Sequence, residues 1–206
     1  MDLILGLVLA GIVFLMANGL FKLLNRPKII RIDPEQRPNT ALLVIDMQTD
    51  FTKNHDKASK HSAFELINSL AMEKQRTGVA VIEIRHVFVA LHEKLFMRMT
   101  AGGAGVEGSP GIDRDDALSF QADQLFTKHQ MDSFSVPAFE SYLDQHKIGH
   151  LYITGQEANA CIQATANGAL ARGYEITLVD EGILSADQHK WQKNRENLLL
   201  KGARIQ

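Results

Sequence analysis

The sequence predicts an α/β fold, a three-layer doubly wound sheet of mostly parallel strands, preceded by one N-terminal transmembrane helix. Short, wholly apolar runs alternate with helical stretches, a pattern typical of parallel strands that are covered on both faces. Residues 3–21 carry no charged side chain, whereas charged residues are frequent from residue 22 onward. A length of 206 residues fits one globular domain with little chain to spare.

Composition excludes several classes of protein. The chain has 22 Lys and Arg against 24 Asp and Glu, and this net charge of -2 gives no reason to expect nucleic acid as a partner. A hydrophobic content of 45% is too high for a disordered chain. The single cysteine, Cys161, rules out an intramolecular disulfide and a cysteine-rich zinc site.

Residues 1–24 are interpreted as a retained transmembrane anchor. A helix over residues 3–21 spans roughly 28 Å, close to the thickness of the hydrocarbon core, so the lipid bilayer is the expected partner of this segment. A cleaved signal peptide is the alternative, but it needs a basic n-region and a small-residue cleavage site, and neither is clear here. A buried helix of a soluble domain fits poorly, because the run is apolar on every face.

The residues that flank the anchor predict its orientation. Four basic residues follow it: Lys22, Arg26, Lys28 and Arg31. The positive-inside rule therefore predicts a single-pass membrane protein with its N-terminus outside and its domain in the cytoplasm. Residues 25–40 contain three prolines and mixed charges, and are interpreted as a semi-rigid linker to a domain at residues 41–206.

Six strands are predicted in the domain. The strong signals are the apolar runs at 41–45, 79–84, 150–154 and 174–179, and the weaker ones lie at 124–127 and 203–205. Helices are predicted over residues 62–75 and 158–172, the second of which stops at Gly173. Residues 100–119 are rich in glycine and are predicted to form a long loop, and such loops are often functional.

Three chemically distinct side chains are expected at one edge of this sheet. Asp46 and Lys128 each end a strand, and Cys161 lies just beyond the strand at 150–154. Ligands of open α/β sheets bind outside the carboxyl ends of the strands, where these residues meet. A helix N-terminus and a lysine favour the nucleophilic thiolate, and an aspartate can move its proton. The pattern therefore indicates an acyl-transfer site.

Each of these residues also has a plain structural interpretation. A lone cysteine often fills apolar space, an aspartate after a strand often caps a helix, and a lysine is usually solvated. Spacing alone leaves both interpretations open.

Three motifs strengthen the catalytic interpretation. They are residues 41–51 (ALLVIDMQTDF), Lys128 within TKHQMDSFSVPAFESYL, and residues 153–174 (ITGQEANACIQATANGALARGY). Together they resemble the isochorismatase-like cysteine hydrolases, a family that includes nicotinamidases, N-carbamoylsarcosine amidase, and ureidoacrylate and biuret hydrolases. The resemblance covers residues 40 to 190. It implies the isochorismatase-like fold and a homo-oligomer.

The resemblance also implies a role for each residue of the motifs. Cys161 is the expected nucleophile, Asp46 the general base and acid, and Lys128 the residue that stabilises the thiolate. The family usually has a cis peptide bond after the strand glycine, which here implies Gln156-Glu157. The backbone amides of Glu157 and Cys161 are then the expected oxyanion donors.

Departures from the family pattern narrow the expected function. Nicotinamidases have an Asp-x-His metal motif after the second strand, whereas this chain reads IRHVF at residues 84–88. His86 and His92 are too few ligands for a metal site, so no metal and no cofactor is expected, and nicotinamide becomes a weaker candidate. Ala158 replaces the usual threonine. Glu157 is an unusual charge in the turn, which either repels anionic substrates or points to solvent.

Four further residues are candidates for the substrate pocket. Phe51 and Phe134 suit an apolar wall, Arg85 suits a substrate carboxylate, and Gln48 suits a polar contact with substrate. Core packing is the alternative for both phenylalanines, and a surface ion pair is the alternative for Arg85.

The sequence thus predicts a membrane-anchored cysteine hydrolase. Its expected reaction is cleavage of a C–N bond in a small amide, ureide or carbamoyl compound through a thioester on Cys161. The isochorismate-cleaving branch of the family typically lacks this cysteine, which favours C–N bond hydrolysis. Two alternatives use the same fold: a catalytically silent scaffold tethered to the membrane, and a thiol redox sensor.

Overall fold

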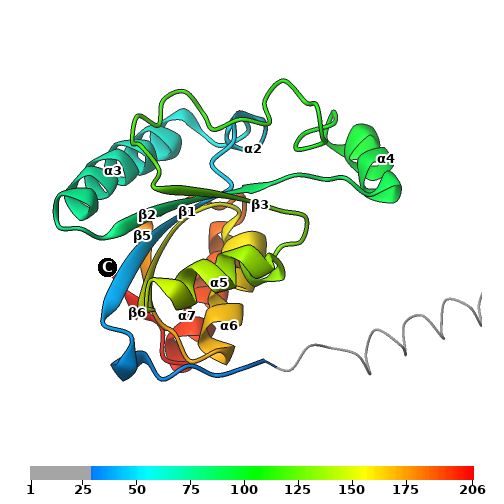
Figure 1. Cartoon of the computed structure of the whole chain (residues 1–206). Coiled ribbons are helices and arrows are strands. Elements are labelled where there is room, and N and C mark those ends of the chain that lie inside the picture. Colours follow the sequence, from blue (N-terminus) through cyan, green and yellow to red (C-terminus); the bar gives the residue numbers. More distant parts are fainter. Residues whose placement is uncertain (1–28) are drawn as a thin grey trace, which may run out of the picture. The chain divides into compact units, whose positions relative to one another are not determined.

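The core of the fold is a six-stranded parallel sheet with the strand order β3-β2-β1-β4-β5-β6 (Figure 1). In chain order the strands are β1 (Asn39–Ile45), β2 (Ala80–His86), β3 (Gln124–Lys128), β4 (Ile148–Gly155), β5 (Glu175–Ile183) and β6 (Arg204–Ile205). Each predicted strand is present, and the parallel pairing is confirmed for all five neighbouring pairs.

Helices cover both faces of the sheet (Figure 1). The helix α3 (Lys57–Arg76) covers one face, with α2 (Thr49–Thr52) and α4 (Leu91–Thr100) on the same side. The opposite face carries α5 (Pro137–Gln145), α6 (Gln163–Ala171) and α7 (Gln188–Leu200). Short helical turns complete the chain: η1 (Pro34–Gln36), η2 (Ser133–Ser135) and η3 (Ala158–Ile162). The predicted three-layer arrangement therefore describes the domain.

The alternating side chains of β1 explain why both layers of helices are needed. Leu42 and Val44 pack into the apolar cluster that contains Ile67 of α3. Leu43 and Ile45 point to the other face and join the larger cluster. All of these side chains are fully buried, because a central parallel strand has no solvent-facing side. This is why the sequence of β1 is wholly apolar rather than alternating.

The computed structural model describes residues 29–206, so the predicted anchor and the first part of the predicted linker lie outside the described residues. Within that described range, no helix combines the length and the apolar character needed to cross a membrane. The end of the predicted linker belongs to the domain. The backbone N–H of Ile32 donates to the carbonyl of Arg172, and the guanidinium of Arg37 lies 2.7 Å from Asp144 Oδ1.

Several helices differ from the prediction. The chain from Leu91 to Thr100 forms α4, which the sequence did not indicate because none of its side chains is buried. Residues 158–172 form two elements, the π-helical turn η3 and then α6, instead of one helix. The helix α3 begins at Lys57, capped by Asp56, whose carboxylate accepts from Ser59 N.

The strand order reverses between β1 and β4, which makes their carboxyl ends the topological switch point of the sheet. Gly155 ends β4 with φ 116°, and a Cβ there would collide with the backbone carbonyl of Ile45. Only glycine permits this close approach of the two strand ends. The crevice that follows them holds the candidate site.

Candidate active site

Asp46 and Lys128 form a buried ion pair at the carboxyl edge of the sheet. Lys128 Nζ lies 2.8 Å from Asp46 Oδ2, and the two residues are 0% and 2% exposed. Asp46 follows β1 with φ 54°, a left-handed conformation that aspartate tolerates better than most residues. The strand register pairs β1 with β2 and β2 with β3, so the ends that carry these two residues stay close.

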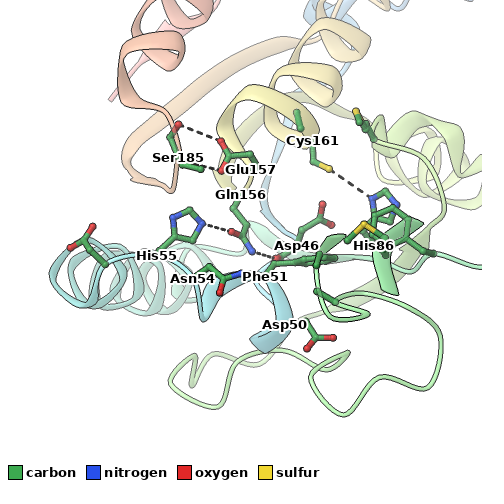
Figure 2. Close-up of a pocket in the computed structure, with 18 residues that line it drawn as sticks. Asp46, Asp50, Phe51, Asn54, His55, His86, Gln156, Glu157, Cys161 and Ser185 are labelled. Carbon is green, nitrogen blue, oxygen red and sulfur yellow. Dashed lines mark hydrogen bonds between the residues drawn. The ribbon is translucent and has the colours of Figure 1, made fainter. Parts of the chain in front are cut away.

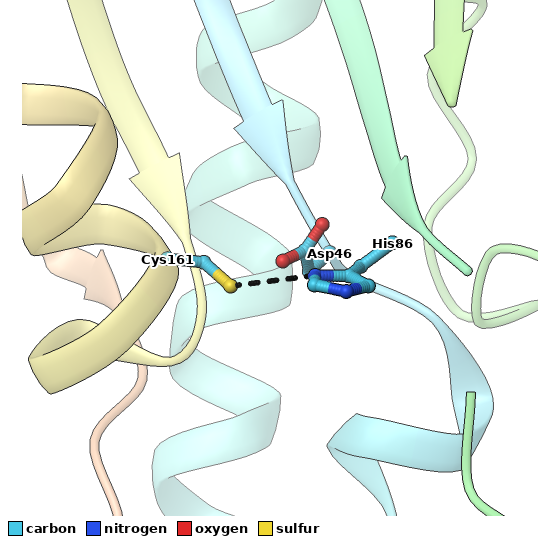
Figure 3. A group of neighbouring side chains, drawn as sticks. All are labelled: Asp46, His86 and Cys161. Carbon is cyan, nitrogen blue, oxygen red and sulfur yellow. Dashed lines mark hydrogen bonds between the residues drawn. The ribbon is translucent and has the colours of Figure 1, made fainter. Parts of the chain in front are cut away.

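Cys161 joins this pair from the other side of the switch point. It lies in η3, directly after β4, and its thiol is buried. The atoms Sγ of Cys161, a carboxylate oxygen of Asp46 and a ring nitrogen of His86 all lie within 4.8 Å of one another (Figure 3). Together with the Asp46–Lys128 pair, this brings together the three residues that the sequence predicted as a catalytic group, Asp46, Lys128 and Cys161.

His86 is a fourth member of this cluster, and sequence reasoning considered it only as a metal ligand. Its Nδ1 lies 3.0 Å from Lys128 Nζ and 3.8 Å from Cys161 Sγ. Because an ammonium only donates, Nδ1 accepts and the ring proton resides on Nε2. His86 ends β2, so the rule that selected Asp46 and Lys128 would also have selected it.

The electrostatic environment keeps the cysteine thiol neutral. Burial, followed by the Asp46 carboxylate, raises the pKa of Cys161 to about 12. This differs from the sequence-based expectation of a preformed thiolate, because the desolvation of the sulfur outweighs the attraction of Lys128. Asp46 Oδ1 has no hydrogen-bond partner among residues 29–206, so its lone pairs are free to accept a proton.

Two groups next to the sulfur are candidate bases, and their environments distinguish them. Burial, and then the charge of Lys128, lower the pKa of His86 to about 3. Burial raises the pKa of Asp46, against the opposing effect of Lys128. A raised pKa makes Asp46 the better proton acceptor, while His86 stays neutral and fixes the position of Lys128.

A metal ion fits this donor set poorly. Asp46, His86 and Cys161 are close enough to share a cation. However, Asp46 Oδ2 and His86 Nδ1 both accept from the Lys128 ammonium, which leaves only Asp46 Oδ1 and the Cys161 sulfur of this cluster to bind a metal. A divalent cation there would also be repelled by the Lys128 ammonium at short range.

Glu157 connects the turn that carries Cys161, residues 155–163, to the loop between β5 and α7. The bond between Gln156 and Glu157 is cis, as the family resemblance implied. The Glu157 carboxylate accepts from Ala186 N at 2.8 Å and from Ser185 Oγ and Asn159 N, both at 3.3 Å. The side chain thus acts as an N-cap of η3, a role that neither interpretation of this charge had anticipated.

A cavity of about 540 Å³ opens above the cluster (Figure 2). Asp46, His86 and Cys161 line it together with His55 and Gln156. Gln156 Nε2 donates to the backbone carbonyl of Asp46 at 3.0 Å, and its Oε1 lies 2.6 Å from His55 Nε2. This chain of contacts supports the left-handed backbone at Asp46.

Of the four residues predicted for the substrate pocket, Phe51 lines the cavity. The other three assignments are corrected. Gln48 is fully buried and bonds the backbone of His86, with Oε1 accepting from its N–H at 2.7 Å. Arg85 pairs with Glu83 and Asp113.

Phe134 is also absent from the cavity, because it belongs to the apolar core on the other face of the sheet. It packs edge to face against Phe139, with ring centroids 5.2 Å apart. Phenylalanine suits a pocket wall and a core equally well, so only the tertiary structure distinguishes the two.

The fold and this site define an α/β domain with a buried acid–lysine–thiol cluster at its switch point. A family model described as Isochorismatase domain matches residues 40–206, so the chain belongs to the isochorismatase family. The family resemblance inferred from the motifs is therefore confirmed. The expected absence of a metal, and the catalytic roles of the individual residues, stay predictions.

Two curated relatives are similar to this chain in sequence. The "Uncharacterized isochorismatase family protein YddQ" of Bacillus subtilis is 25% identical over 144 residues, which cover 69% of this chain and 76% of the relative. The "Probable inactive nicotinamidase At3g16190" of Arabidopsis thaliana is 28% identical over 165 residues, which cover 74% of this chain and 84% of the relative.

Solved structures share the fold. A pyrazinamidase/nicotinamidase from Streptococcus mutans has a TM-score of 0.70 at 20% identity, with 82% of this chain and 100% of that chain covered. N-carbamoylsarcosine amidase from Thermoplasma acidophilum also has a TM-score of 0.70 at 20% identity, with 82% of this chain and 95% of that chain covered. At this identity the likeness establishes the architecture and leaves the substrate open.

Proposed function

We propose that this protein hydrolyses a C–N bond of a small amide, ureide or carbamoyl compound through a thioester on Cys161. The observation that carries the proposal is the buried cluster of Asp46, Lys128 and Cys161 beneath an open cavity. Membership of a hydrolase family that contains amidases supports it.

In the first step, Asp46 accepts the proton of the Cys161 thiol as Sγ forms a bond to the carbonyl carbon. The raised pKa of Asp46 and the short distance between the two groups favour this transfer. Lys128 then lies beside a developing thiolate that its charge stabilises. The backbone amides of Glu157 and Cys161 are the proposed donors to the oxyanion.

In the second step, the C–N bond breaks and Asp46 returns the proton to the departing nitrogen, which leaves as ammonia or an amine. The acyl group remains on Sγ as a thioester. Water then attacks the thioester carbonyl with Asp46 as base, releasing a carboxylic acid and restoring the thiol. The sum is amide plus water giving acid plus amine, and no oxidant or cofactor enters.

The test is Cys161→Ala with ammonia release from a panel of amides as the readout. We expect turnover to disappear while the midpoint of denaturant unfolding changes little, since the substitution removes only one sulfur atom, which borders the cavity. Mass spectrometry of the native protein with substrate would detect the acyl adduct on Cys161. Turnover that survives in the variant would refute the mechanism.

The membrane anchor is part of this proposal. Residues 3–21 are proposed to span the bilayer once, with the N-terminus outside and the domain in the cytoplasm. Fractionation of cells that express the full chain, compared with a chain that starts at residue 29, tests the anchor. Labelling of the full chain by an impermeant amine reagent in intact cells tests the orientation, and modified domain lysines would overturn it.

A catalytically silent scaffold is the second candidate, favoured by the similarity to a relative named as an inactive nicotinamidase. It predicts no ammonia from any amide and no acyl adduct. The redox-sensor interpretation has less support, because a thiol with a pKa of about 12 presents little thiolate to an oxidant.

A further inference from the structure

The cavity above Cys161 is lined by two kinds of side chain. One part is polar and includes Asn54, His55 and Ser185, which Figure 2 shows near Gln156 and Glu157. The other part is apolar: Phe51, Phe88, Met97, Ala101, Ala104 and Met131. A ligand that reaches the sulfur therefore meets a large apolar surface around the rest of its body.

The charged residues of the lining are all acidic. They are Asp46, Asp50, Asp56 and Glu157, and no lysine or arginine among residues 29–206 lines the cavity. Lys128 is fully buried and engaged with Asp46, and Lys53, which does not line the cavity, pairs with Asp50 at 3.3 Å. Arg85, the residue that suits a carboxylate, is paired elsewhere. A carboxylate on the ligand would lose its hydration and meet acidic side chains, while the cations beside them are already paired.

The apolar part is built to hold a ring or a short alkyl chain. Phe51 and Phe88 meet edge to face, with centroids 6.4 Å apart. Met97 and Met131 add flexible thioethers, which pack favourably on aromatic rings. A cavity of about 540 Å³ lies within the range of sites that bury a whole small molecule.

From these observations we propose that the substrate is an uncharged amide with an apolar body of ring size, and that the cavity discriminates against amides that carry a carboxylate. The amide nature of the ligand rests on the proposed function. The selectivity for an uncharged apolar body rests on the lining alone. Met97 and Met131 are the proposed specificity-determining residues. They supply apolar surface, whereas binding a substrate carboxylate would require a cationic side chain at such a position.

The first experiment compares phenylacetamide, (4-carboxyphenyl)acetamide and acetamide as substrates of the full-length protein. We expect kcat/KM for phenylacetamide to exceed that for each of the others by on the order of tenfold or more. Acetamide lacks the ring that the apolar wall would bury, and the carboxylated compound is repelled by the acidic lining. Equal or higher kcat/KM for the carboxylated compound would overturn the proposal.

The second experiment moves a cation into the cavity. Met131→Arg places a guanidinium at a residue that is 57% exposed and lines the cavity. Met99→Arg is the matched control, because Met99 is 86% exposed and lies outside the lining. We expect Met131→Arg to raise the preference for the carboxylated substrate by about tenfold, and Met99→Arg to leave it unchanged. Equal shifts in both variants would contradict the assignment, and Met97→Arg provides a second cavity variant.

Binding to the Cys161→Ala variant, measured by calorimetry, separates the two proposals. Tighter binding of phenylacetamide than of its carboxylated analogue supports the selectivity even if no amide is turned over, in which case the proposed function alone fails. Turnover of both compounds with no preference removes the selectivity and leaves the function intact. Binding of neither compound overturns the selectivity.

Discussion

Two regions that face the same cavity are built in opposite ways. The nucleophile region, residues 155–163 with the side chains packed on it, is buried and dense in polar contacts. The α4 region, residues 89–112, exposes Leu91, Leu95, Phe96 and Met99, and α4 buries no side chain. The first region holds the Cys161 sulfur through many polar contacts, whereas the second supplies apolar surface to the cavity.

Their connections to the rest of the domain differ accordingly. Glu157 and Asn159 bind the nucleophile turn to the start of α7, and Ala158 and Ile162 anchor it in the core. The α4 region is attached through Asp50, whose carboxylate accepts from Gly105 N and from the Ser109 hydroxyl, and through backbone hydrogen bonds to Phe88. The comparison teaches that the proposed chemistry and the proposed substrate selectivity depend on separately supported parts of the fold.

The strongest test of this contrast compares two ion pairs. Lys128→Met leaves the Asp46 charge buried without a partner, and we expect a loss of about 3–5 kcal/mol in the free energy of unfolding. Lys94→Met removes the exposed pair with Glu107 in the α4 region and should cost about 0–1 kcal/mol. Denaturant titration measures both. Similar losses would mean that the two regions are not supported differently.

A double variant provides the control for this test. Asp46→Asn with Lys128→Met removes both charges, so most of the stability lost in Lys128→Met should return. A double variant as unstable as the single one would show that lost packing of the lysine, rather than the unpaired carboxylate, causes the effect.

The reactivity of Cys161 tests the electrostatics of the nucleophile region. A shift of its pKa from 9.0 to about 12 leaves roughly a thousandfold less thiolate at pH 8, so alkylation by iodoacetamide should be slower by about that factor than for an ordinary thiol. Asp46→Asn should accelerate it, because the carboxylate is the second cause of the shift after burial. An ordinary alkylation rate in the unaltered protein would contradict this account.

The same shift has a consequence for stability. The folded state holds the thiol proton more tightly than the unfolded chain does. Stability should therefore fall as the pH rises above the ordinary thiol pKa, where only the unfolded chain releases the proton. Cys161→Ala should remove this part of the pH dependence.

Substitutions at two glycines of the α4 region distinguish the effect of backbone strain from the effect of a changed contact with the cavity. Gly108→Ala introduces a side chain at φ 81° with nothing within 4 Å, and should cost about 1–2 kcal/mol. Gly105→Ala, at φ 70°, also pushes a Cβ into the ring of Phe51 and should cost about 2–4 kcal/mol. We expect only Gly105→Ala to raise KM, because Phe51 lines the cavity. A raised KM in Gly108→Ala would show that this loop affects binding through its backbone.

The smallest expected loss of stability comes from replacing an acidic residue at the start of η3 or of α4. Glu157→Ala removes the N-cap of η3 and should cost about 1 kcal/mol and lower kcat, because the nucleophile turn loses its contact with Ser185 and Ala186. Glu93→Ala lies in the first turn of α4, which has no side-chain cap, and should cost less than about 0.5 kcal/mol. Equal costs would remove the distinction between the caps.

The errors of the sequence analysis have physical causes. The helix α4 escaped prediction because its apolar residues do not face a core, so the usual link between periodicity and burial is absent. Arg85 suggested a carboxylate site by its chemistry, but Glu83 on the same strand and Asp113 neutralise it. Glu157 is an unexpected charge in the turn when the sequence alone is considered, because the residues that bind its carboxylate lie 28 and 29 positions further along the chain.

The sequence by itself determined the parallel sheet, because strands covered on both faces must be apolar throughout and leave that pattern in the chain. It also placed Asp46, Lys128 and Cys161 at one edge, since the carboxyl ends of parallel strands share a side. Only the tertiary structure showed which residues are in contact. His86 lies in the cluster, Gln48 and Phe134 lie outside the cavity, and burial keeps the Cys161 thiol neutral. These outcomes depend on burial and on neighbours distant in sequence, and no local pattern encodes either.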